Sequence, residues 1–154
     1  MSVKSSNLIT GFLACLLLLS FASVLYAWDV TFKDGVIDDP ELGLQWAPAP
    51  DRTMDHYQAE EYARNLTLAG GGWRLPTLFE LKSLYNQIKK VQKGYSPDIK
   101  KFNVSDKLVW TSELAGNQRD RAKALNFFNG WEQSPFSDNA DNPTMCVLAV
   151  RPLR

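Results

Sequence analysis

The stretch GGGWRLPT, residues 70–77, decides the fold of this chain together with Glu80 and Leu81, which follow it. Three consecutive glycines end the preceding helix, because glycine adopts left-handed conformations without a Cβ clash. Pro76 fixes its own φ and pushes Leu75 toward an extended conformation. Thr77 and Glu80 have the spacing of a capping box, so a second helix is expected to start after Thr77. The stretch predicts a helix, a tight connection and another helix, and it contains no obvious nucleophile or metal ligand.

Two amphipathic helices are expected to flank this connection. The first covers residues 56–68, with Asp55 as its N-cap and Gln58 completing a capping box. The second covers residues 78–91. Each has apolar residues at the i, i+3, i+4, i+7 spacing of one buried face. These residues are Ala59, Tyr62, Ala63 and Leu66 in the first helix, and Leu81, Leu84, Tyr85 and Ile88 in the second.

Short strands are expected on either side of the helices, because the apolar period there is two. Asp34-Gly35 predicts a hairpin turn between two of them, and Asn129-Gly130 predicts a type I′ turn. Residues 113–120 and 134–144 are polar and are expected to be loops. The expected strands cover residues 30–32, 36–37, 42–46, 108–112, 122–128 and 146–150. The fold class is therefore α+β, with two helices packed on a small antiparallel sheet with long polar loops.

The first 27 residues are expected to lie outside this domain. Lys4 provides a positive n-region and residues 8–27 are almost wholly apolar, as in a secretory signal peptide cleaved after Ala27. The apolar run is also just long enough to span a bilayer as an uncleaved anchor. A third interpretation, a lipobox ending at Cys15, is disfavoured by the apolar residues that follow it. Residues 28–154 are expected to form one exported domain, periplasmic or extracellular, that meets a membrane only if the anchor is retained.

The charge balance argues against one class of partner. The chain has 17 basic and 17 acidic residues, and this near-neutrality makes nucleic acid an unsuitable main partner. The charge is unevenly spread, because residues 28–61 contain nine acidic and two basic residues, whereas residues 82–107 contain seven lysines and two acidic residues. The lysines are more typical of a solvated face than of a site for acidic polysaccharide.

Several motifs, in their order along the chain, resemble those of a bacterial family typified by the C-terminal domain of the Lcl collagen-like adhesin. The resemblance covers nearly all of residues 29–152 and implies a C-type-lectin-like fold. It also implies that the ligand is a glycan or another envelope component, and it implies little about activity. The sequence has no collagen-like stalk, so a role that depends on stalk-driven trimerisation is not expected. The matching pieces are residues 38–46, 57–60, 65–66, 72–81, 109–112, 124–130 and 150–151.

Four tryptophans are candidates for a carbohydrate platform, because sugars stack on indole faces. Trp46, Trp73 and Trp110 stand inside the motifs that define the fold, so core packing is the preferred interpretation for them. Trp131 follows a turn and precedes polar residues. It is the best candidate for an exposed binding residue.

Other residues of the motifs are interpreted as structural. Arg74 stands between two apolar residues and is expected to pair with a carboxylate in the core, either Glu80 or an acid of the N-terminal turn. Pro76 and Thr77 shape the connection, and Glu80 is expected to cap the second helix. Arg151 matches the closing valine-arginine of the family, and the resemblance makes it a structural residue too.

Asp138, Asn139, Asp141 and Asn142 stand in the loop before the closing strand. With Trp131 they are the candidate ligand-binding residues. Their oxygen atoms suit Ca²⁺, with Asp138 and Asp141 as its charged ligands. The same composition is typical of an ordinary surface loop, and the spacing matches no EF-hand. No cofactor is expected, and Ca²⁺ is kept as an open alternative.

The sequence argues against catalysis. Cys146 is the one cysteine after residue 27, and a buried, apolar thiol is preferred over a nucleophile or an intermolecular bridge. A catalytic thiol needs a nearby base, and the single histidine, His56, stands on the first expected helix. The chain is therefore expected to be a non-catalytic binding module.

The expected ligand of this module, a glycan or another envelope component, lies on the loops 113–120 and 132–144. The alternative function is that of an accessory subunit that docks a protein of a bacterial envelope assembly. The sequence does not separate these two functions, and it predicts no oligomeric state.

Overall fold

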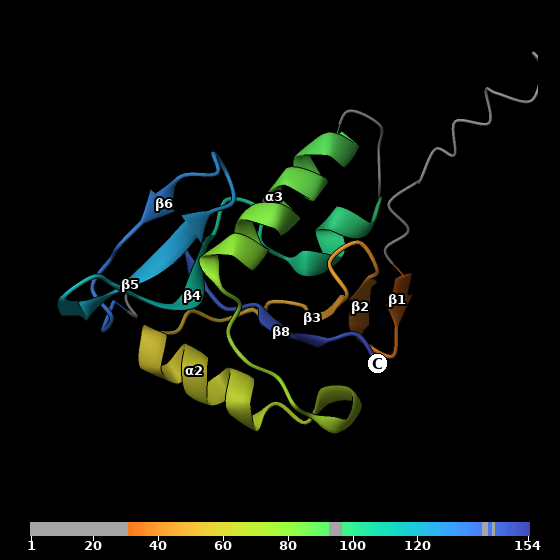
Figure 1. The fold of residues 1–154 in the computed structure, drawn as a ribbon, viewed down its shortest axis with the longest axis horizontal. Coiled ribbons are helices and arrows are strands. Elements are labelled where there is room, and N and C mark those ends of the chain that lie inside the picture. The colour runs from red at the N-terminus through yellow and green to blue at the C-terminus, as the bar shows by residue number, and fades with distance from the viewer. Residues whose placement is uncertain (1–30, 93–96, 140–141, 143) are drawn as a thin grey trace, which may run out of the picture.

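The structure, a computed structural model, describes residues 31–92, 97–139, 142 and 144–154. Within these residues the chain forms an α+β fold, as predicted (Figure 1). The predicted signal peptide or anchor lies outside them. No helix of the described part is long and apolar enough to cross a membrane. The elements are β1 Thr31–Lys33, β2 Val36–Asp39, β3 Leu44–Ala47, α2 His56–Asn65, the 3-10 helix η1 Leu68–Gly70, α3 Leu78–Gln92, the 3-10 helix η2 Pro97–Phe102, β4 Leu108–Ala115, β5 Gln118–Asn126, β6 Glu132–Gln133, β7 Met145–Cys146 and β8 Ala149–Pro152.

The strands of the described part form two four-stranded sheets, not the single small sheet that the sequence predicted. One has the order β1-β2-β3-β8 and the other β6-β5-β4-β7. All pairs are antiparallel except β4 with β7, which are parallel. The predicted closing strand, residues 146–150, is split between the sheets, because Val147 and Leu148 lead the chain from β7 to β8. Residues 145–150 are all buried, so their continuous apolar run could not show where one strand ends and the next begins.

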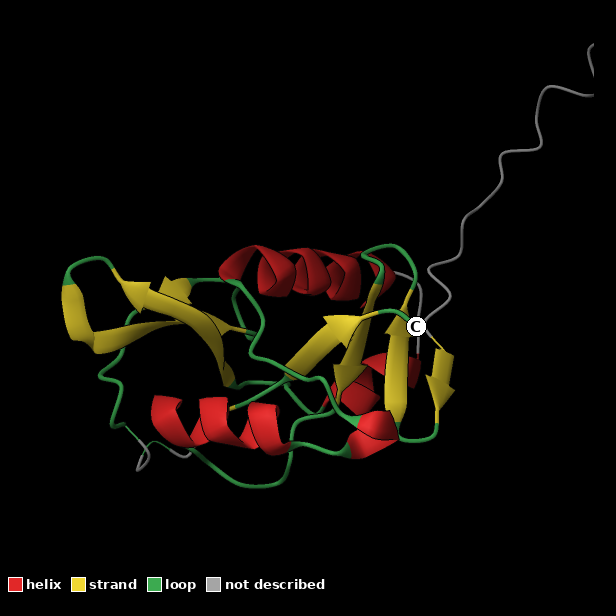
Figure 2. Cartoon of the chain, turned by 60° about the horizontal axis from the view of Figure 1, so that its bottom comes forward, coloured by secondary structure: helices red, strands yellow, loops and turns green. Residues whose placement is uncertain are grey.

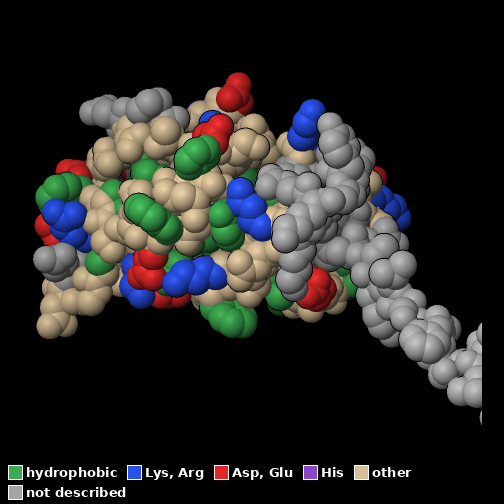
Figure 3. All heavy atoms as spheres, turned by 90° about the horizontal axis from the view of Figure 1, so that it is seen from above, with side chains coloured by type: hydrophobic (Ala, Val, Ile, Leu, Met, Phe, Trp, Pro, Cys, Tyr) green, Lys and Arg blue, Asp and Glu red, His purple; other side chains and the backbone are tan. Residues whose placement is uncertain are grey.

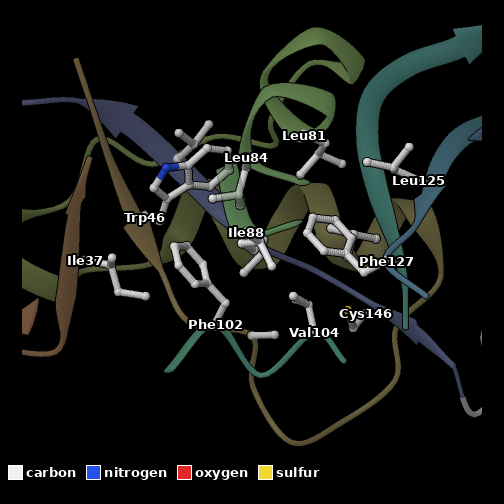
Figure 4. Packing of buried hydrophobic residues seen from close by; sticks show 14 of the residues in the cluster. Ile37, Trp46, Leu81, Leu84, Ile88, Phe102, Val104, Leu125, Phe127 and Cys146 are labelled. Carbon is white, nitrogen blue, oxygen red and sulfur yellow. The ribbon is translucent and has the colours of Figure 1, made fainter. Parts of the chain in front are cut away.

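The two helices lie on opposite sides of the strands, α3 on one and α2 on the other (Figures 1 and 2). On the α3 side, the helix packs Leu84 and Ile88 among large apolar residues that include Trp46 and Phe102 (Figure 4). The last two rings meet edge to face, with centroids 6.4 Å apart. This layered arrangement agrees with an α+β domain, and the C-type-lectin-like topology implied by the resemblance stays a prediction.

Helix α2 begins as predicted and ends earlier. The side chain of Asp55 accepts a hydrogen bond from the backbone N–H of Gln58, and the backbone N–H of Asp55 donates to Gln58 Oε1. The helix ends at Asn65, not at residue 68, because Leu66 is extended. On a continuous helix Leu66 and Leu68 would point about 200° apart. Because the helix ends early, both can pack against the cluster of buried apolar residues on the α2 side of the strands, which we call the α2-side core.

The glycines of the connection 70–77 have the left-handed conformation that the sequence predicts, but they follow η1 and do not themselves end α2. Gly70, Gly71 and Gly72 all have positive φ, at 92°, 74° and 82°. Arg74 then forms an isolated antiparallel bridge with Val150 of β8. The stretch that separates the two helices therefore also extends one of the sheets.

The capping box at the start of α3 is also confirmed. The backbone N–H of Glu80 donates to Thr77 Oγ1 over 3.2 Å, and the backbone N–H of Thr77 donates to Glu80 Oε2 over 2.8 Å. Pro76 is buried just before it, and its carbonyl accepts a hydrogen bond from the backbone N–H of Ser112 in β4. Helix α3 is thereby fixed to the second sheet at its first turn.

The predicted loop 113–120 is a β-hairpin instead. Strands β4 and β5 continue to Ala115 and Gln118, and Gly116 starts the tight turn between them with φ at 58°. A bulge separates the pairs of Trp110 and Leu114. The sequence did not reveal this hairpin because residues 112–121 lack the alternation of apolar residues that marks a strand.

Candidate functional site

Two exposed aromatic rings stand on the turn between β5 and β6. Phe128 is 68% exposed and Trp131 is 70% exposed. The exposure predicted for Trp131 is therefore confirmed. Phe128 was missed, although its position beside the predicted Asn129-Gly130 turn could have indicated that it lies on a surface.

The turn is longer than predicted and is stabilised by asparagine side chains. It covers residues 127–131, and Asn129 does not have the positive φ that a type I′ turn requires. The backbone N–H of Phe128 donates to Asn126 Oδ1 over 2.8 Å, and that of Trp131 donates to Asn129 Oδ1 over 2.9 Å. Such bonds fix the turn locally, so the two aromatic side chains project from a defined backbone.

Gly130 places this turn directly on α3. Its φ is 76°, and a Cβ atom at this position would lie 2.5 Å from Cε1 of Tyr85. Tyr85 is itself held edge to face against Phe127, with ring centroids 5.9 Å apart, and Lys89 Nζ lies 5.3 Å from its ring centroid. Glycine therefore lets the turn approach the helix more closely than any other residue could.

Four charged side chains join α3, β4, β5 and β6 beside the turn, and we call them the charged ladder: Lys82, Glu132, Lys123 and Glu113. Lys82 Nζ lies 3.1 Å from Glu132 Oε2, and Lys123 Nζ lies 3.7 Å from Glu132 Oε1 and 3.2 Å from Glu113 Oε2. The backbone N–H of Leu78 donates to Glu113 Oε1 over 2.9 Å. This bond, with that from Lys123, holds the pKa of Glu113 below its ordinary value.

Phe79 adds a third exposed ring next to the ladder. It is 74% exposed on the first turn of α3, three residues before Lys82, and residues three apart on a helix are neighbours. We call Phe79, Phe128, Trp131 and the charged ladder the aromatic surface. Figure 3 shows the molecule from the α3 side, where hydrophobic side chains lie among basic and acidic ones. The sequence did not indicate Phe79 as a candidate. Its spacing from Leu81 and Leu84 predicts only that it lies off the buried face of α3, as many ordinary surface residues do.

Two of the predicted ligand-binding residues, Trp131 and Asp138, lie beside different helices. Trp131 lies on the α3 side, whereas the chain reaches the start of α2 at Ser137, whose carbonyl accepts a hydrogen bond from the backbone N–H of His56 over 2.8 Å. Asp138 follows and is exposed. Because α2 and α3 lie on opposite sides of the strands (Figure 2), Trp131 and Asp138 lie near different helices.

The oxygens predicted for Ca²⁺ are only partly described. Asn142 Oδ1 accepts hydrogen bonds from the backbone N–H and the hydroxyl of Thr144, at 3.0 and 2.7 Å, so it stabilises a local turn. The backbone N–H of Asn139 donates to the carbonyl of Phe136. Asp141 lies outside the described residues. Within the described residues, no three His, Cys, Asp or Glu side chains form a group that could hold a metal ion.

The three tryptophans of the motifs are buried, as predicted. Each indole N–H has a hydrogen-bond acceptor, which a buried tryptophan needs. Trp46 donates to Asp39 Oδ2 over 3.2 Å, Trp73 to the carbonyl of Leu68 over 2.8 Å, and Trp110 to the carbonyl of Met54 over 2.9 Å. They stabilise the fold and leave Trp131 as the exposed tryptophan of the described part.

Arg74 pairs with Glu80, one of the two partners that the sequence left open. Nη1 and Nη2 of Arg74 donate to the two carboxylate oxygens over 2.9 and 2.7 Å. The pair lies at the surface, not in the core, because 47% of the Arg74 side chain is exposed. Residue 74 lies in an extended segment between buried Trp73 and Leu75, so its side chain points the opposite way from theirs.

Arg151, unlike Arg74, is buried. Its Nη1 donates to the carbonyls of Ala69 and Gly71, and its Nε donates to Gln45 Oε1. The guanidinium carbon lies 4.3 Å from the ring centroid of Trp73. Burial, and then the charge of nearby Arg154, lower the pKa of Arg151. Arg151 therefore joins β8 to the glycine connection, and this agrees with the structural role that the resemblance implied.

Cys146 and His56 lie in different parts of the core. Cys146 is fully buried on the α3 side, and burial raises the pKa of its thiol to about 12. His56 is buried on the α2 side, where Nε2 lies 2.8 Å from the carbonyl of Thr111 and the ring lies edge to face on Trp110. A carbonyl can only accept, so Nε2 carries the proton. The predicted buried thiol is confirmed, and the single histidine does not lie beside it.

The fold and its glycine connection define a small α+β domain built around buried tryptophans and one buried arginine. The family model described as the Lcl C-terminal domain matches residues 35–151, and the chain belongs to this family. The resemblance found from the motifs is thereby confirmed. No curated protein matches the chain.

Proposed function

We propose that this chain is an exported, non-catalytic interaction module that docks another protein of the bacterial envelope on its aromatic surface. The observation that carries the proposal is the turn 127–131. It presents two largely exposed aromatic rings on a backbone fixed by hydrogen bonds and seated on α3. Exposed aromatic side chains that are already ordered are the usual anchors of protein interfaces, because little conformational entropy is lost when they bind.

The pairing of the charges supports a protein partner over a glycan at this surface. Lys82, Lys123, Glu113 and Glu132 bind one another, so few free donors or acceptors are left to receive sugar hydroxyls. Aromatic rings bordered by satisfied polar groups resemble the anatomy of a protein interface. We therefore place docking of an envelope protein, the alternative function indicated by the sequence, ahead of glycan binding.

A glycan stacked on Trp131 is the second candidate. The open indole of Trp131 supports it, since aromatic faces pack against sugar rings. The family resemblance also implies such a ligand. The separation of Trp131 from Asp138 argues against a single glycan-binding surface that includes both Trp131 and the predicted loop 132–144.

The non-catalytic part of the proposal rests on the state of the two side chains best suited to chemistry. The Cys146 thiol, with its pKa at about 12, stays protonated near neutral pH, and a protonated thiol is a poor nucleophile. His56 binds a backbone carbonyl inside the core. Export rests on the sequence of residues 1–27 and on the family.

The proposal is tested by affinity capture from the envelope fraction of the native host. Wild type is compared with the double variant Phe128→Ala/Trp131→Ala and with Phe32→Ala, which removes a half-exposed ring from β1 in the other sheet. We expect wild type and Phe32→Ala to recover the same protein in stoichiometric amount. The double variant should recover it about tenfold less or worse, as expected for the loss of interface anchors.

Two outcomes contradict the proposal. One is recovery of no stoichiometric protein by wild type. The other is a partner whose recovery the double variant does not change. A glycan array with and without Ca²⁺ tests the second candidate with the same variants, and glycan binding lost in the double variant would establish the glycan at this surface in place of a protein.

A further inference from the structure

The turn 127–131 contains the one asparagine-glycine pair of the chain, Asn129-Gly130. In such a pair the backbone nitrogen of the glycine can attack Cγ of the asparagine side chain, because glycine has no Cβ atom to hinder the approach. Asn129 is exposed, so water reaches the site of attack. The pair stands between Phe128 and Trp131, and a change in it therefore alters the backbone that carries both rings.

The reaction open to this pair is deamidation. A bond forms between the Gly130 nitrogen and Asn129 Cγ, the Cγ–Nδ2 bond breaks, and the proton of the Gly130 N–H passes through solvent to the departing ammonia. Water then opens the five-membered succinimide ring at one of its two carbonyls. Opening at Cγ restores the main chain and leaves aspartate. Opening at the backbone carbonyl leaves isoaspartate, whose main chain runs through Cβ and Cγ and is one carbon longer.

Hydrogen bonds of the turn restrain both reacting groups. The Gly130 N–H donates to the carbonyl of Asn126 over 2.7 Å, and this bond has to break before the nitrogen can attack. Asn129 Oδ1 accepts from the backbone N–H of Trp131 over 2.9 Å, which restrains the side chain that has to close the ring. Ring closure in the folded chain therefore costs the additional free energy of breaking these bonds.

Packing and the ends of the turn add further restraints. Gly130 rests on Tyr85 with no space for a Cβ atom between them, so the tyrosine ring opposes rotation of the backbone at Gly130. Asn126 closes the turn, because its backbone N–H donates to the carbonyl of Trp131 over 2.9 Å and its Oδ1 accepts from the Phe128 N–H over 2.8 Å. Deamidation therefore requires the turn to open locally, and the reaction rate follows the population of the open turn.

We propose that Asn129 is a site of spontaneous deamidation whose rate is set by local opening of the turn 127–131. While the turn is closed on α3, the reaction is slow. Once the turn has opened and the ammonia has left, closing the turn does not restore the asparagine.

The two products affect the aromatic surface differently. Aspartate keeps an oxygen that accepts from the Trp131 N–H, so the turn is conserved. Isoaspartate lengthens the main chain between Phe128 and Trp131, so the two exposed rings lose their spacing. Deamidation to isoaspartate therefore ends the docking of a protein partner, a consequence that rests on the proposed function, whereas the reaction itself does not.

The test of the reaction is peptide mapping by mass spectrometry of the purified full chain, sampled over time at pH 8. We expect Asn129 to deamidate about tenfold more slowly, or slower still, in the native chain than in the chain unfolded by guanidinium chloride. Asn126→Ala removes the acceptor of the Phe128 N–H and should speed the native reaction several-fold. Asn142→Ala is the matched control, since it removes an asparagine oxygen that accepts a backbone N–H in another turn. It should leave the rate at Asn129 unchanged.

Three results overturn the proposal. One is the absence of deamidation at Asn129 in the unfolded chain. Another is an equal rate in the native and unfolded wild type, which would show that the turn has no control over the reaction. The third is a rate in Asn126→Ala no faster than in Asn142→Ala.

The consequence for docking is tested by affinity capture from the envelope fraction. The isoaspartate form, separated by chromatography from aged protein, should recover about tenfold less of the partner than fresh wild type does. Asn129→Asp, whose main chain has the ordinary length, should recover nearly as much as fresh wild type. Equal recovery by the isoaspartate form and fresh wild type overturns the effect on docking. Recovery of no partner by fresh wild type contradicts the proposed function instead, and the measured rates at Asn129 still stand.

Discussion

A Cβ atom added to Gly130 would lie 2.5 Å from Cε1 of Tyr85. The turn that presents Phe128 and Trp131 therefore rests on α3 with no room for a side chain between them. The orientation of both exposed rings is coupled to the packing of one tyrosine in the helix. Gly130 therefore affects the surface that we propose for docking as well as the geometry of the turn.

Gly130→Ala should destabilise the protein by about 1–3 kcal/mol. The substitution combines strain at a positive φ with overlap against the Tyr85 ring. Urea unfolding, with both variants at the same pH, measures the change. Gly116→Ala is the matched control, because Gly116 also has positive φ but has open space around its Cβ position. Its smaller cost measures the strain alone, and equal costs for the two variants would contradict close packing on Tyr85.

Glu80→Ala should cost about 1–2 kcal/mol at neutral pH, since Glu80 both caps α3 and binds Arg74. Glu80→Gln should cost less, because glutamine can still complete a capping box. Burial opposes the ionisation of Glu80, but hydrogen bonds from Arg74 and Thr77 outweigh it and lower its pKa.

The lowered pKa of Glu80 fixes the direction of the pH dependence. A carboxyl group whose pKa is lowered by folding stabilises the folded state above its unfolded pKa, about 4.3, and this contribution is lost as the pH falls through the folded pKa. The gap in unfolding free energy between wild type and Glu80→Gln should therefore be full at pH 7 and shrink in acid. Urea unfolding at a series of pH values tests this, and a gap that widens toward acid would contradict the ion pair.

Arg151→Lys should destabilise the protein by roughly 2–4 kcal/mol, although it keeps the charge. Lysine cannot reproduce the planar stack on Trp73 or donate from one fork to several acceptors, so buried groups are left unpaired. Thermal and urea unfolding measure the loss. Arg154→Lys, the same change at an exposed arginine, should have an effect within about 0.5 kcal/mol. Similar effects at both positions would show that Arg151 has no special structural role.

Cys146 should resist alkylation in the folded protein. Its thiol is fully buried and its pKa is raised to about 12. The reagent therefore cannot reach the sulfur, and little of the reactive thiolate is present. Iodoacetamide labelling at pH 8, with peptide mapping to isolate Cys146, should be slow until urea unfolds the chain. Ser112→Cys introduces an exposed thiol and should react quickly under the same conditions. Fast labelling of native Cys146 would contradict a buried, protonated thiol.

The glycine connection and both capping boxes were predictable because each depends on neighbours within a few positions. The partner of Arg74 was predictable for the same reason, since Glu80 stands six residues away. The surface position of the Arg74–Glu80 pair depends on the direction in which the Arg74 side chain points from an extended backbone. The spacing of the two residues does not predict that direction. The burial of the three tryptophans was predicted from the motifs in which they stand, although their packing is long-range.

Long-range features were not predictable in this way. The division of residues 145–152 between two sheets depends on pairing with β4 and β3, far earlier in the chain. The exposed rings of Phe79 and Phe128 became candidates only when the charged ladder joined α3 to β6. The separation of Trp131 from Asp138 likewise follows from which helix each loop approaches.

The most direct test of the central proposal is site-specific photo-crosslinking in the native host. A photoreactive phenylalanine analogue replaces Phe128 in one strain and Phe32 in another, so both probes replace an exposed ring. We expect the probe at position 128 to give one dominant adduct with an envelope protein and the probe at position 32 to give none. Equal adduct patterns from the two positions, or no adduct at position 128, would contradict the claim that the aromatic surface docks a protein partner.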